Sequence, residues 1–275
     1  MSKLKVRVIS GVVGAAIVLA MIFSTPAVFH LLIAAACFVM MHELRTTYQQ
    51  EKKWQLVVLN SLFATVILVS PVLPMTWQLF LLSFLLVAYL MLLLMCAVIW
   101  HETISFADVI SSFFILIYAV LLPMHVSYIR MMNLGRELVI LALLGAWMPD
   151  TFAYFIGCAF GRHKLIPGVS PNKTVEGSCG AVLGAVVTFL AYGLIMDFGL
   201  GYQVSYVALL VLAVLCGIVA QFGDLAASVI KRSYGVKDFG NLIPGHGGVV
   251  DRVDSLLFVA PLVYYFLLVF EVVCK

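Results

Sequence analysis

Hydrophobic residues occur along this chain in long unbroken runs that short polar segments separate. A transmembrane helix needs about 20 consecutive apolar residues, whereas the strands of a transmembrane β-barrel alternate apolar and polar residues in segments of about ten. The runs here have the helical length. They therefore predict an all-α, polytopic integral membrane protein with about nine transmembrane helices. We expect the spans at residues 8–23, 25–42, 55–73, 76–99, 107–129, 138–160, 178–197, 203–222 and 254–274.

The overall composition excludes two other classes of protein. Of the 275 residues, 64% are hydrophobic and 11% are charged, against about 25% charged in a typical soluble domain. A single soluble core cannot bury so much apolar surface, and disordered chains are polar and charged. Lys and Arg exceed Asp and Glu by 16 to 13. This excess is too small to indicate a nucleic-acid partner, and we expect none.

Positive charges predict the orientation, because cytoplasmic loops carry an excess of Lys and Arg. Lys3, Lys5 and Arg7 precede the first span, so we place the N-terminus in the cytoplasm. That span could also be a signal peptide, although no typical cleavage site follows it. Arg130 and Arg136 fall on the opposite side and are the exception to this topology. The predicted cytoplasmic loops are residues 43–54, 100–106, 161–177 and 223–253.

Two short stretches, residues 150–177 and 221–254, hold 13 of the 29 charged side chains. The first begins with Asp150 inside a predicted span, and Tyr154 shares its helix face. A carboxylate inside the bilayer is costly and usually faces a polar cavity, so we interpret Asp150 as functional. It could also be a structural aspartate paired with a cation on a neighbouring helix. Two pairs of glycines four residues apart predict close helix packing, Gly157 with Gly161 and Gly180 with Gly184.

The loop that follows this span reads Ser170-Pro-Asn-Lys173-Thr174-Val-Glu176-Gly177. Lys173 and Thr174 could hold a phosphate, and Glu176 could orient Lys173 or cap the next helix. The glycine spacing is wrong for a P-loop of the Walker A type. Taken alone, the segment is equally typical of a solvated basic loop.

The second stretch is the densest in polar side chains. Asp224, Ser228 and Lys231 lie on one helix face, and Pro244-Gly245-His246-Gly247-Gly248 could bring backbone amides close to a phosphate. Carboxylate oxygens without a histidine or thiolate cluster favour a hard cation such as Mg²⁺. Lys and Arg beside them favour a phosphorylated ligand. A positive-inside loop with helix-capping aspartates would explain Asp251 and Asp254, which open the last span, but it explains Asp224 poorly.

At these residues the chain resembles the CDP-diacylglycerol synthase family, also called phosphatidate cytidylyltransferases. The family's C-terminal signature matches Ser228-Val-Ile-Lys231-Arg232, Lys237-Asp238, and Pro244-Gly-His246-Gly247-Gly248-Val-Val-Asp251-Arg252-Val-Asp254 without a departure. The segments around Asp150 and Lys173 also resemble the family, apart from Asn172, where the family often has Lys or Gly. These motifs cover roughly residues 148–257. The N-terminal half is similar only in being a set of hydrophobic spans.

The resemblance implies a reaction in which CTP and phosphatidate form CDP-diacylglycerol and pyrophosphate, with Mg²⁺ as the cofactor. It also implies that the reaction takes place at the cytoplasmic face of a membrane, which we expect to be a bacterial inner membrane. We expect residues 1–137 to form about five N-terminal spans and residues 138–275 to form the catalytic region. A phosphate nucleophile is already ionised near pH 7, so His246 is expected to contact substrate and not to act as a base. One or two cations, and a monomer or a homodimer, remain open.

We assign roles to the motif residues as hypotheses. Asp224 and Asp251 hold Mg²⁺, and Asp254 is a third ligand or an acceptor beside the ligands. A CTP-dependent kinase of a polyprenol is a nearby alternative, and a transporter with an ion site around Asp150 is an alternative of another class. The expected substrate contacts are Lys173, Thr174, Ser228, Lys231, Arg232, Lys237, His246, Gly247, Gly248 and Arg252, with Asp150 and Tyr154 lining a polar cavity.

Overall fold

The computed structural model describes residues 3–274. Within that part of the chain, 9 helical segments are long and apolar enough to cross a membrane. They match the predicted spans in number and order, so the prediction of an all-α polytopic membrane protein is confirmed. Some boundaries differ. The second helix continues to Thr47 and the eighth to Ser233, because polar residues at the end of a span need not end the helix. The ninth helix begins and ends earlier than predicted, at Val250 and Val269.

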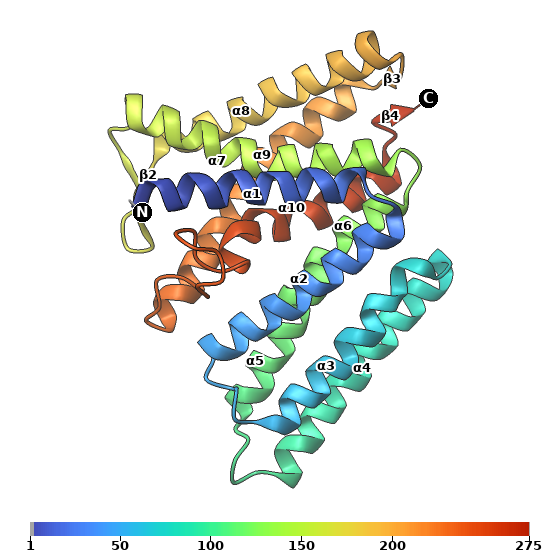
Figure 1. Cartoon of the computed structure of the whole chain (residues 1–275), viewed down its shortest axis with the longest axis vertical. Helices are drawn as coiled ribbons and strands as arrows, with labels where there is room; N and C mark the ends of the chain where they lie inside the picture. Colours follow the sequence, from blue (N-terminus) through green and yellow to red (C-terminus); the bar gives the residue numbers. More distant parts are fainter. Residues whose placement is uncertain (1–2, 275) are drawn as a thin grey trace. The chain divides into compact units, whose positions relative to one another are not determined.

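The chain forms two compact units, and unit 1 comprises Met1–Met131 together with Asp238–Asp251. Segment 238–251 therefore packs with the N-terminal helices, although more than a hundred residues separate them along the chain. Figure 1 shows α3 and α4 of this unit side by side. Its helices are α1 (Lys3–Phe23), α2 (Pro26–Thr47), α3 (Trp54–Val69), η1 (Ser70–Val72), α4 (Met75–Ile99), α5 (Phe106–Leu116), η2 (Ile117–Leu121) and α6 (Leu122–Met131).

Unit 2 comprises Met132–Lys237 and Arg252–Lys275. Two short antiparallel strand pairs, β1 with β2 and β3 with β4, accompany its helices. The second pair joins the loop after η3 to the C-terminal segment (Figure 1). The elements are α7 (Gly135–Phe160), β1 (Lys164–Ile166), β2 (Ser170–Thr174), α8 (Val175–Leu194), η3 (Ile195–Gly199), β3 (Gln203–Val204), α9 (Tyr206–Ser233), α10 (Val250–Val269, which begins in unit 1) and β4 (Val273–Cys274).

Glycines allow α7 and α8 to pack closely, as their spacing predicted. A Cβ added at Gly184 would lie 2.2 Å from Cγ of Phe152, and one at Gly180 would lie 2.7 Å from Cδ1 of Ile156. A Cβ at Gly157 would lie 3.1 Å from Oγ1 of Thr174. Side chains larger than hydrogen would therefore separate the helices, and close backbone approach is the way in which small residues stabilise helix pairs in membranes.

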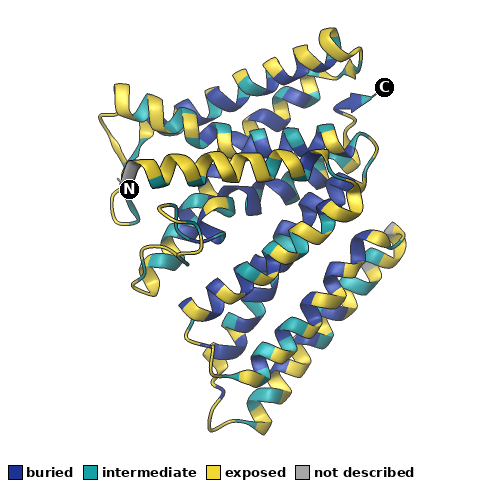
Figure 2. Ribbon diagram, in the orientation of Figure 1, coloured by how far each residue is buried: buried dark blue, intermediate teal, exposed yellow. Residues whose placement is uncertain are grey.

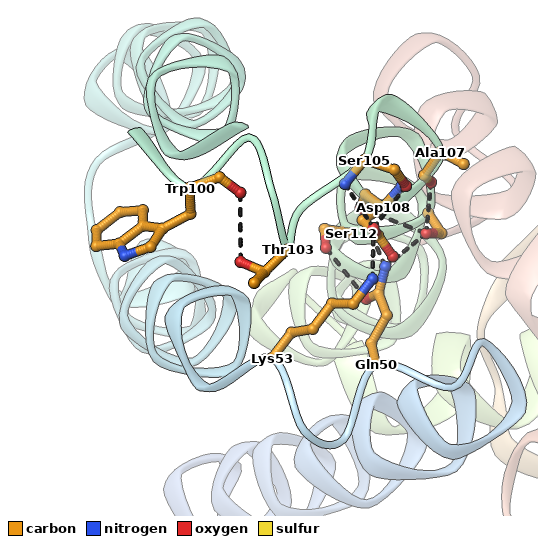
Figure 3. A network of polar contacts seen from close by, with 9 residues as sticks. Gln50, Lys53, Trp100, Thr103, Ser105, Ala107, Asp108 and Ser112 are labelled. Atoms are coloured by element: carbon orange, nitrogen blue, oxygen red, sulfur yellow. Dashed lines mark hydrogen bonds and ion pairs between the residues drawn. The ribbon is translucent and has the colours of Figure 1, made fainter. Parts of the chain in front are cut away.

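A polar network in unit 1 holds the loop between α2 and α3 against the start of α5 (Figure 3). Asp108 caps α5 by accepting a hydrogen bond from the Ser105 amide at 2.8 Å, and Lys53 Nζ lies 2.5 Å from the same carboxylate oxygen. Gln50 donates to the Asp108 carbonyl at 3.0 Å and accepts from Ser112 at 3.1 Å. Because buried polar groups need partners, this network satisfies the buried side chains of Gln50, Asp108 and Ser112.

Arg130, an exception to the predicted charge distribution, is buried and paired. Its side chain is 9% exposed, donates to the Ser24 carbonyl at 2.9 Å and lies over the Phe29 ring at 5.9 Å. Such an arginine serves helix packing in unit 1. It therefore carries less weight as a topological signal than a loop arginine would.

Exposed apolar side chains cover the outer surfaces of the helices. Figure 2 shows α1 as mostly exposed, and its Val12 and Phe23 are 64% and 67% exposed. In a soluble protein such a surface would be unfavourable, but in a membrane protein lipid tails solvate it. Trp54 and Trp77 are 63% and 62% exposed near helix ends, as expected for aromatic residues at the membrane interface.

Candidate active site

Three carboxylates gather in unit 2, on three different helices. Asp150 comes from α7, Asp224 from α9 and Asp254 from α10, and the charge of Asp224 acts on both of the others. Gly223 makes this possible, because a Cβ there would lie 2.7 Å from the carbonyl oxygen of Asp254. The close approach of α9 and α10 thus places Asp224 beside Asp254. Ser255 on α10 donates a 2.7 Å hydrogen bond to Asp150 and joins it to the cluster.

Two lysines supply positive charge to this cluster of carboxylates. Lys173 Nζ lies 2.5 Å from Oδ2 of Asp224, with the two side chains 22% and 30% exposed. The contact is an ion pair outside hydrogen-bond geometry, since Nζ is buried and has no hydrogen-bond partner. Lys173 also attracts Asp150 electrostatically, and Lys231 attracts Asp254. The structure therefore brings together five of the predicted residues, with charges of both signs in one half-buried place.

The loop before α8 carries Lys173 into this cluster through β1 and β2, which pair Lys164 with Thr174. Thr174 caps α8 by accepting from the Gly177 amide at 3.1 Å. Glu176 accepts from the Arg162 amide at 3.0 Å and from the His163 ring at 2.7 Å. Glu176 thus closes the loop on itself, whereas Thr174 is the residue that caps α8 and Asp224 is the carboxylate that pairs with Lys173.

The glycine-rich loop belongs to unit 1 and is an ordered turn. Asp251 Oδ2 accepts hydrogen bonds from the Phe239 amide at 2.8 Å and the Gly248 amide at 3.0 Å. Ile243 donates to the Gly247 carbonyl at 2.9 Å. Gly245 and Gly247 adopt φ of 76° and 84°, a left-handed conformation that favours glycine. Asp251 is therefore an organising residue of this loop as well as a candidate metal ligand.

Sequence reasoning missed three residues that contact the predicted site. Ser255 is the first, and its signal was its position next to Asp254. Ser10 on α1 is the second, since its hydroxyl lies 2.8 Å from His246 Nδ1 and 2.9 Å from the Pro244 carbonyl. Glu43 on α2 is the third, and it accepts from backbone amides at the start of α10. No local pattern indicates the last two contacts, because more than 200 residues separate their partners.

Other predicted residues lie toward the surface. Tyr154 is 66% exposed and its ring contacts Phe155, so its place in a polar cavity stays a prediction. Ser228 is half-buried on α9. The substrate contacts assigned to the exposed cations also stay predictions, namely those of Arg232, Lys237 and Arg252.

The donor chemistry suits a hard cation. Asp150, Asp224 and Asp254 bring carboxylate oxygens together, and such oxygens are the ligands that Mg²⁺ prefers. Asp224 and Asp251, the two expected ligands, belong to different units. In residues 3–274, no group of three or more His, Cys, Asp or Glu side chains is arranged as a metal site. The fit to Mg²⁺ thus rests on the chemistry of the oxygens and not on the arrangement of the side chains.

Fold and site together define a class, a polytopic helical membrane protein with carboxylates and lysines clustered among its helices. A sequence model of the family described as "Cytidylyltransferase family" matches residues 5–270. The phosphatidate cytidylyltransferase of Bacillus subtilis (strain 168) is 35% identical over 281 residues, which cover 98% of this chain and 100% of that protein. This chain therefore belongs to the cytidylyltransferase family, and it is an enzyme of the nucleotidyltransferase class.

Two further relatives match about half of the chain. The phosphatidate cytidylyltransferase of Thermotoga maritima is 42% identical over 144 residues, covering 52% of this chain and 53% of that protein. The enzyme of the same name from Staphylococcus saprophyticus is 41% identical over 128 residues, covering 46% and 48%. The family resemblance noted from the motifs is thus confirmed over nearly the whole chain.

Proposed function

We propose that this enzyme transfers CMP from CTP to phosphatidate, forming CDP-diacylglycerol and pyrophosphate. The observation that carries the proposal is the full-length similarity to a protein named phosphatidate cytidylyltransferase. The cluster around Asp224 and Lys173 supports it, because two polyanions can meet only where cations screen their repulsion. A lipid substrate also requires a site at the membrane boundary, and α9 carries Asp224 near its polar end.

In the reaction, a phosphate oxygen of phosphatidate forms a bond to the α-phosphorus of CTP. The bond from that phosphorus to the bridging oxygen breaks, and pyrophosphate leaves with the electron pair. The attacking phosphate is already ionised near pH 7, so no general base is needed. The protein contributes mainly position and neutralisation of charge. We assign the neutralisation to Lys173, Lys231, Arg232 and Lys237.

The glycine-rich loop lies against the triphosphate in this proposal. The Gly248 amide already donates to Asp251, so phosphate contacts from the loop come from its other groups. His246 is oriented by its contact with Ser10 and serves as a substrate contact. Asp224 and Asp251 would hold Mg²⁺, and such an ion would neutralise charge on the phosphates.

We place the site at the cytoplasmic face of a bacterial inner membrane. CTP is a cytosolic nucleotide, and the loops that carry Lys173, Lys231 and Lys237 are those rich in positive charge. Burial of Arg130 at the opposite end of its span reduces the weight of the exception to this orientation. The test of this orientation uses a variant without the six native cysteines, in which a single cysteine is introduced at residue 168 or 241. We expect an impermeant thiol reagent to label it in lysed cells and not in intact cells.

Pyrophosphate release tests the reaction. Purified protein in detergent receives CTP, phosphatidate and Mg²⁺, and parallel samples receive ATP in place of CTP, a polyprenol in place of phosphatidate, or EDTA. We expect release only with CTP, phosphatidate and metal together, and its loss in Asp224→Asn. The matched control is Asp197→Asn, which should retain turnover. Asp197 lies elsewhere in unit 2 and accepts a hydrogen bond from Tyr206. Consumption of CTP with polyprenol alone would contradict the proposal in favour of a lipid kinase.

A further inference from the structure

Glu43 is a buried carboxylate in α2 whose two oxygens both accept hydrogen bonds from a distant part of the chain. Oε1 accepts from the Val249 amide at 2.8 Å, and Oε2 accepts from the Val250 amide at 2.9 Å. The side chain is 5% exposed. These amides lie at the start of α10, where a helix has backbone donors without intrahelical partners. Glu43 therefore caps α10 across more than 200 residues of sequence.

The segment that leads into α10 encloses this carboxylate on two sides. A Cβ added at Gly240 would lie 2.7 Å from Oε1 of Glu43, and one at Gly248 would lie 2.6 Å from Oε2 and 2.7 Å from Oε1. Real Cβ atoms essentially never approach so closely. Both glycines are thus needed for the loop to close around Glu43, which explains them by close approach and not by flexibility.

Glu43 and Asp251 hold the same loop by complementary contacts. Asp251 accepts from the Phe239 and Gly248 amides, while Glu43 accepts from the next two amides along the chain. Four backbone donors between residues 239 and 250 thus depend on two carboxylates. Loss of Glu43 would leave two buried or half-buried N–H groups unpaired, at the positive end of a helix dipole.

We propose that Glu43 is a positioning residue of the active site, which holds the glycine-rich loop and Asp251 in the geometry that turnover requires. The proposal rests on the proposed function insofar as it concerns turnover. Both carboxylate oxygens of Glu43 accept from backbone amides at the end of the loop, so we assign it an action through the loop and not on a substrate. Small displacements of a catalytic loop reduce turnover steeply, on the order of 100-fold for about 1 Å.

The experiment compares Glu43→Gln and Glu43→Asp with Asp108→Asn. Asp108 is a suitable control because it is also a buried carboxylate of unit 1 that caps a helix, but it belongs to the network of Figure 3. Three quantities are measured in detergent for each variant: the midpoint of thermal unfolding, kcat and KM for CTP and phosphatidate, and hydrogen–deuterium exchange of the amides in segment 239–250.

We expect Glu43→Gln to lower kcat by on the order of 10- to 100-fold with smaller changes in KM. Exchange at Val249 or Val250 should accelerate at least about tenfold, since Gln keeps only one acceptor oxygen and places an NH2 donor against the other amide. Glu43→Asp keeps two acceptor oxygens and should recover part of both losses. Asp108→Asn should lower the unfolding midpoint, while kcat and exchange in segment 239–250 stay as in the wild type.

Two results would overturn the proposal. One is wild-type kcat and wild-type exchange in Glu43→Gln. The other is a fall in kcat that follows the unfolding midpoint equally in Glu43→Gln and Asp108→Asn, because Glu43 would then be a residue of general stability. If the wild-type protein does not use CTP and phosphatidate at all, the proposed function fails, and the exchange measurement alone decides whether Glu43 holds the loop.

Discussion

Removing either member of the Lys173–Asp224 ion pair should have unequal effects on stability. Exposed ion pairs contribute about 0–1 kcal/mol, whereas breaking a buried pair from one side costs about 3–5 kcal/mol. The two side chains are 22% and 30% exposed, between these limits. In Lys173→Met, Asp224 loses its cation and still repels Asp150 and Asp254. We therefore expect the free energy of unfolding to fall by about 2 kcal/mol.

Asp224→Asn removes the same pair but also removes that repulsion. We expect the free energy of unfolding to fall by about 1 kcal/mol or less, so that the protein stays folded while turnover is abolished. For a chain of this size, 1 kcal/mol moves the unfolding midpoint by about 2–4 °C. Lys173→Met should therefore unfold several degrees below the wild type and Asp224→Asn close to it, in intrinsic tryptophan fluorescence of the detergent-solubilised protein.

The double variant tests the balance of charge around Asp224 directly. Lys173→Met combined with Asp224→Asn removes both the cation and the strongest source of repulsion, so it should be more stable than Lys173→Met alone. Pyrophosphate release measured on the same samples should be lost in all three variants. Equal destabilisation by the two single substitutions, or a double variant that loses the sum of both, would refute the charge balance described here. Full turnover in folded Asp224→Asn would refute the role in metal binding.

Two further predictions concern the packing of α7 against α8 and the hydrogen bond to Asp150. Gly184→Ala should destabilise the protein by about 1–3 kcal/mol, because its Cβ would lie 2.2 Å from Cγ of Phe152; Gly14→Ala, with nothing within 4 Å, is the control in the same thermal assay. Ser255→Ala removes the 2.7 Å hydrogen bond to Asp150 and should lower the free energy of unfolding by about 1–3 kcal/mol. An unchanged unfolding midpoint would contradict this prediction.

Local sequence was sufficient to predict the helices. Each span is a run of apolar residues, and in a bilayer every backbone N–H and C=O must be satisfied within the helix itself. Length and hydrophobicity therefore determine a transmembrane helix without knowledge of its neighbours. The glycine pairs at 157/161 and 180/184 were predictable for the same reason, because their spacing places them on one helix face.

The motif residues were likewise identifiable from the chain, since charged side chains in a membrane protein are rare and costly. Sequence order placed Asp224, Lys231 and Asp254 near one another through two consecutive spans. It also placed Lys173 in a loop expected on the same membrane face. The ion pair of Lys173 with Asp224 specifies which lysine neutralises which carboxylate, and spacing alone did not indicate that.

Only the tertiary structure decided what holds the glycine-rich loop. Glu43 lies just beyond the predicted end of the second span, where the sequence predicted a cytoplasmic loop, yet it is buried and caps α10. Ser10 contacts His246 in a similar way. The amino-acid sequence by itself determined the helices and the chemistry of the motifs, because both depend on local composition. Partners more than 200 residues apart meet only after the helices have packed, so no local pattern could predict them.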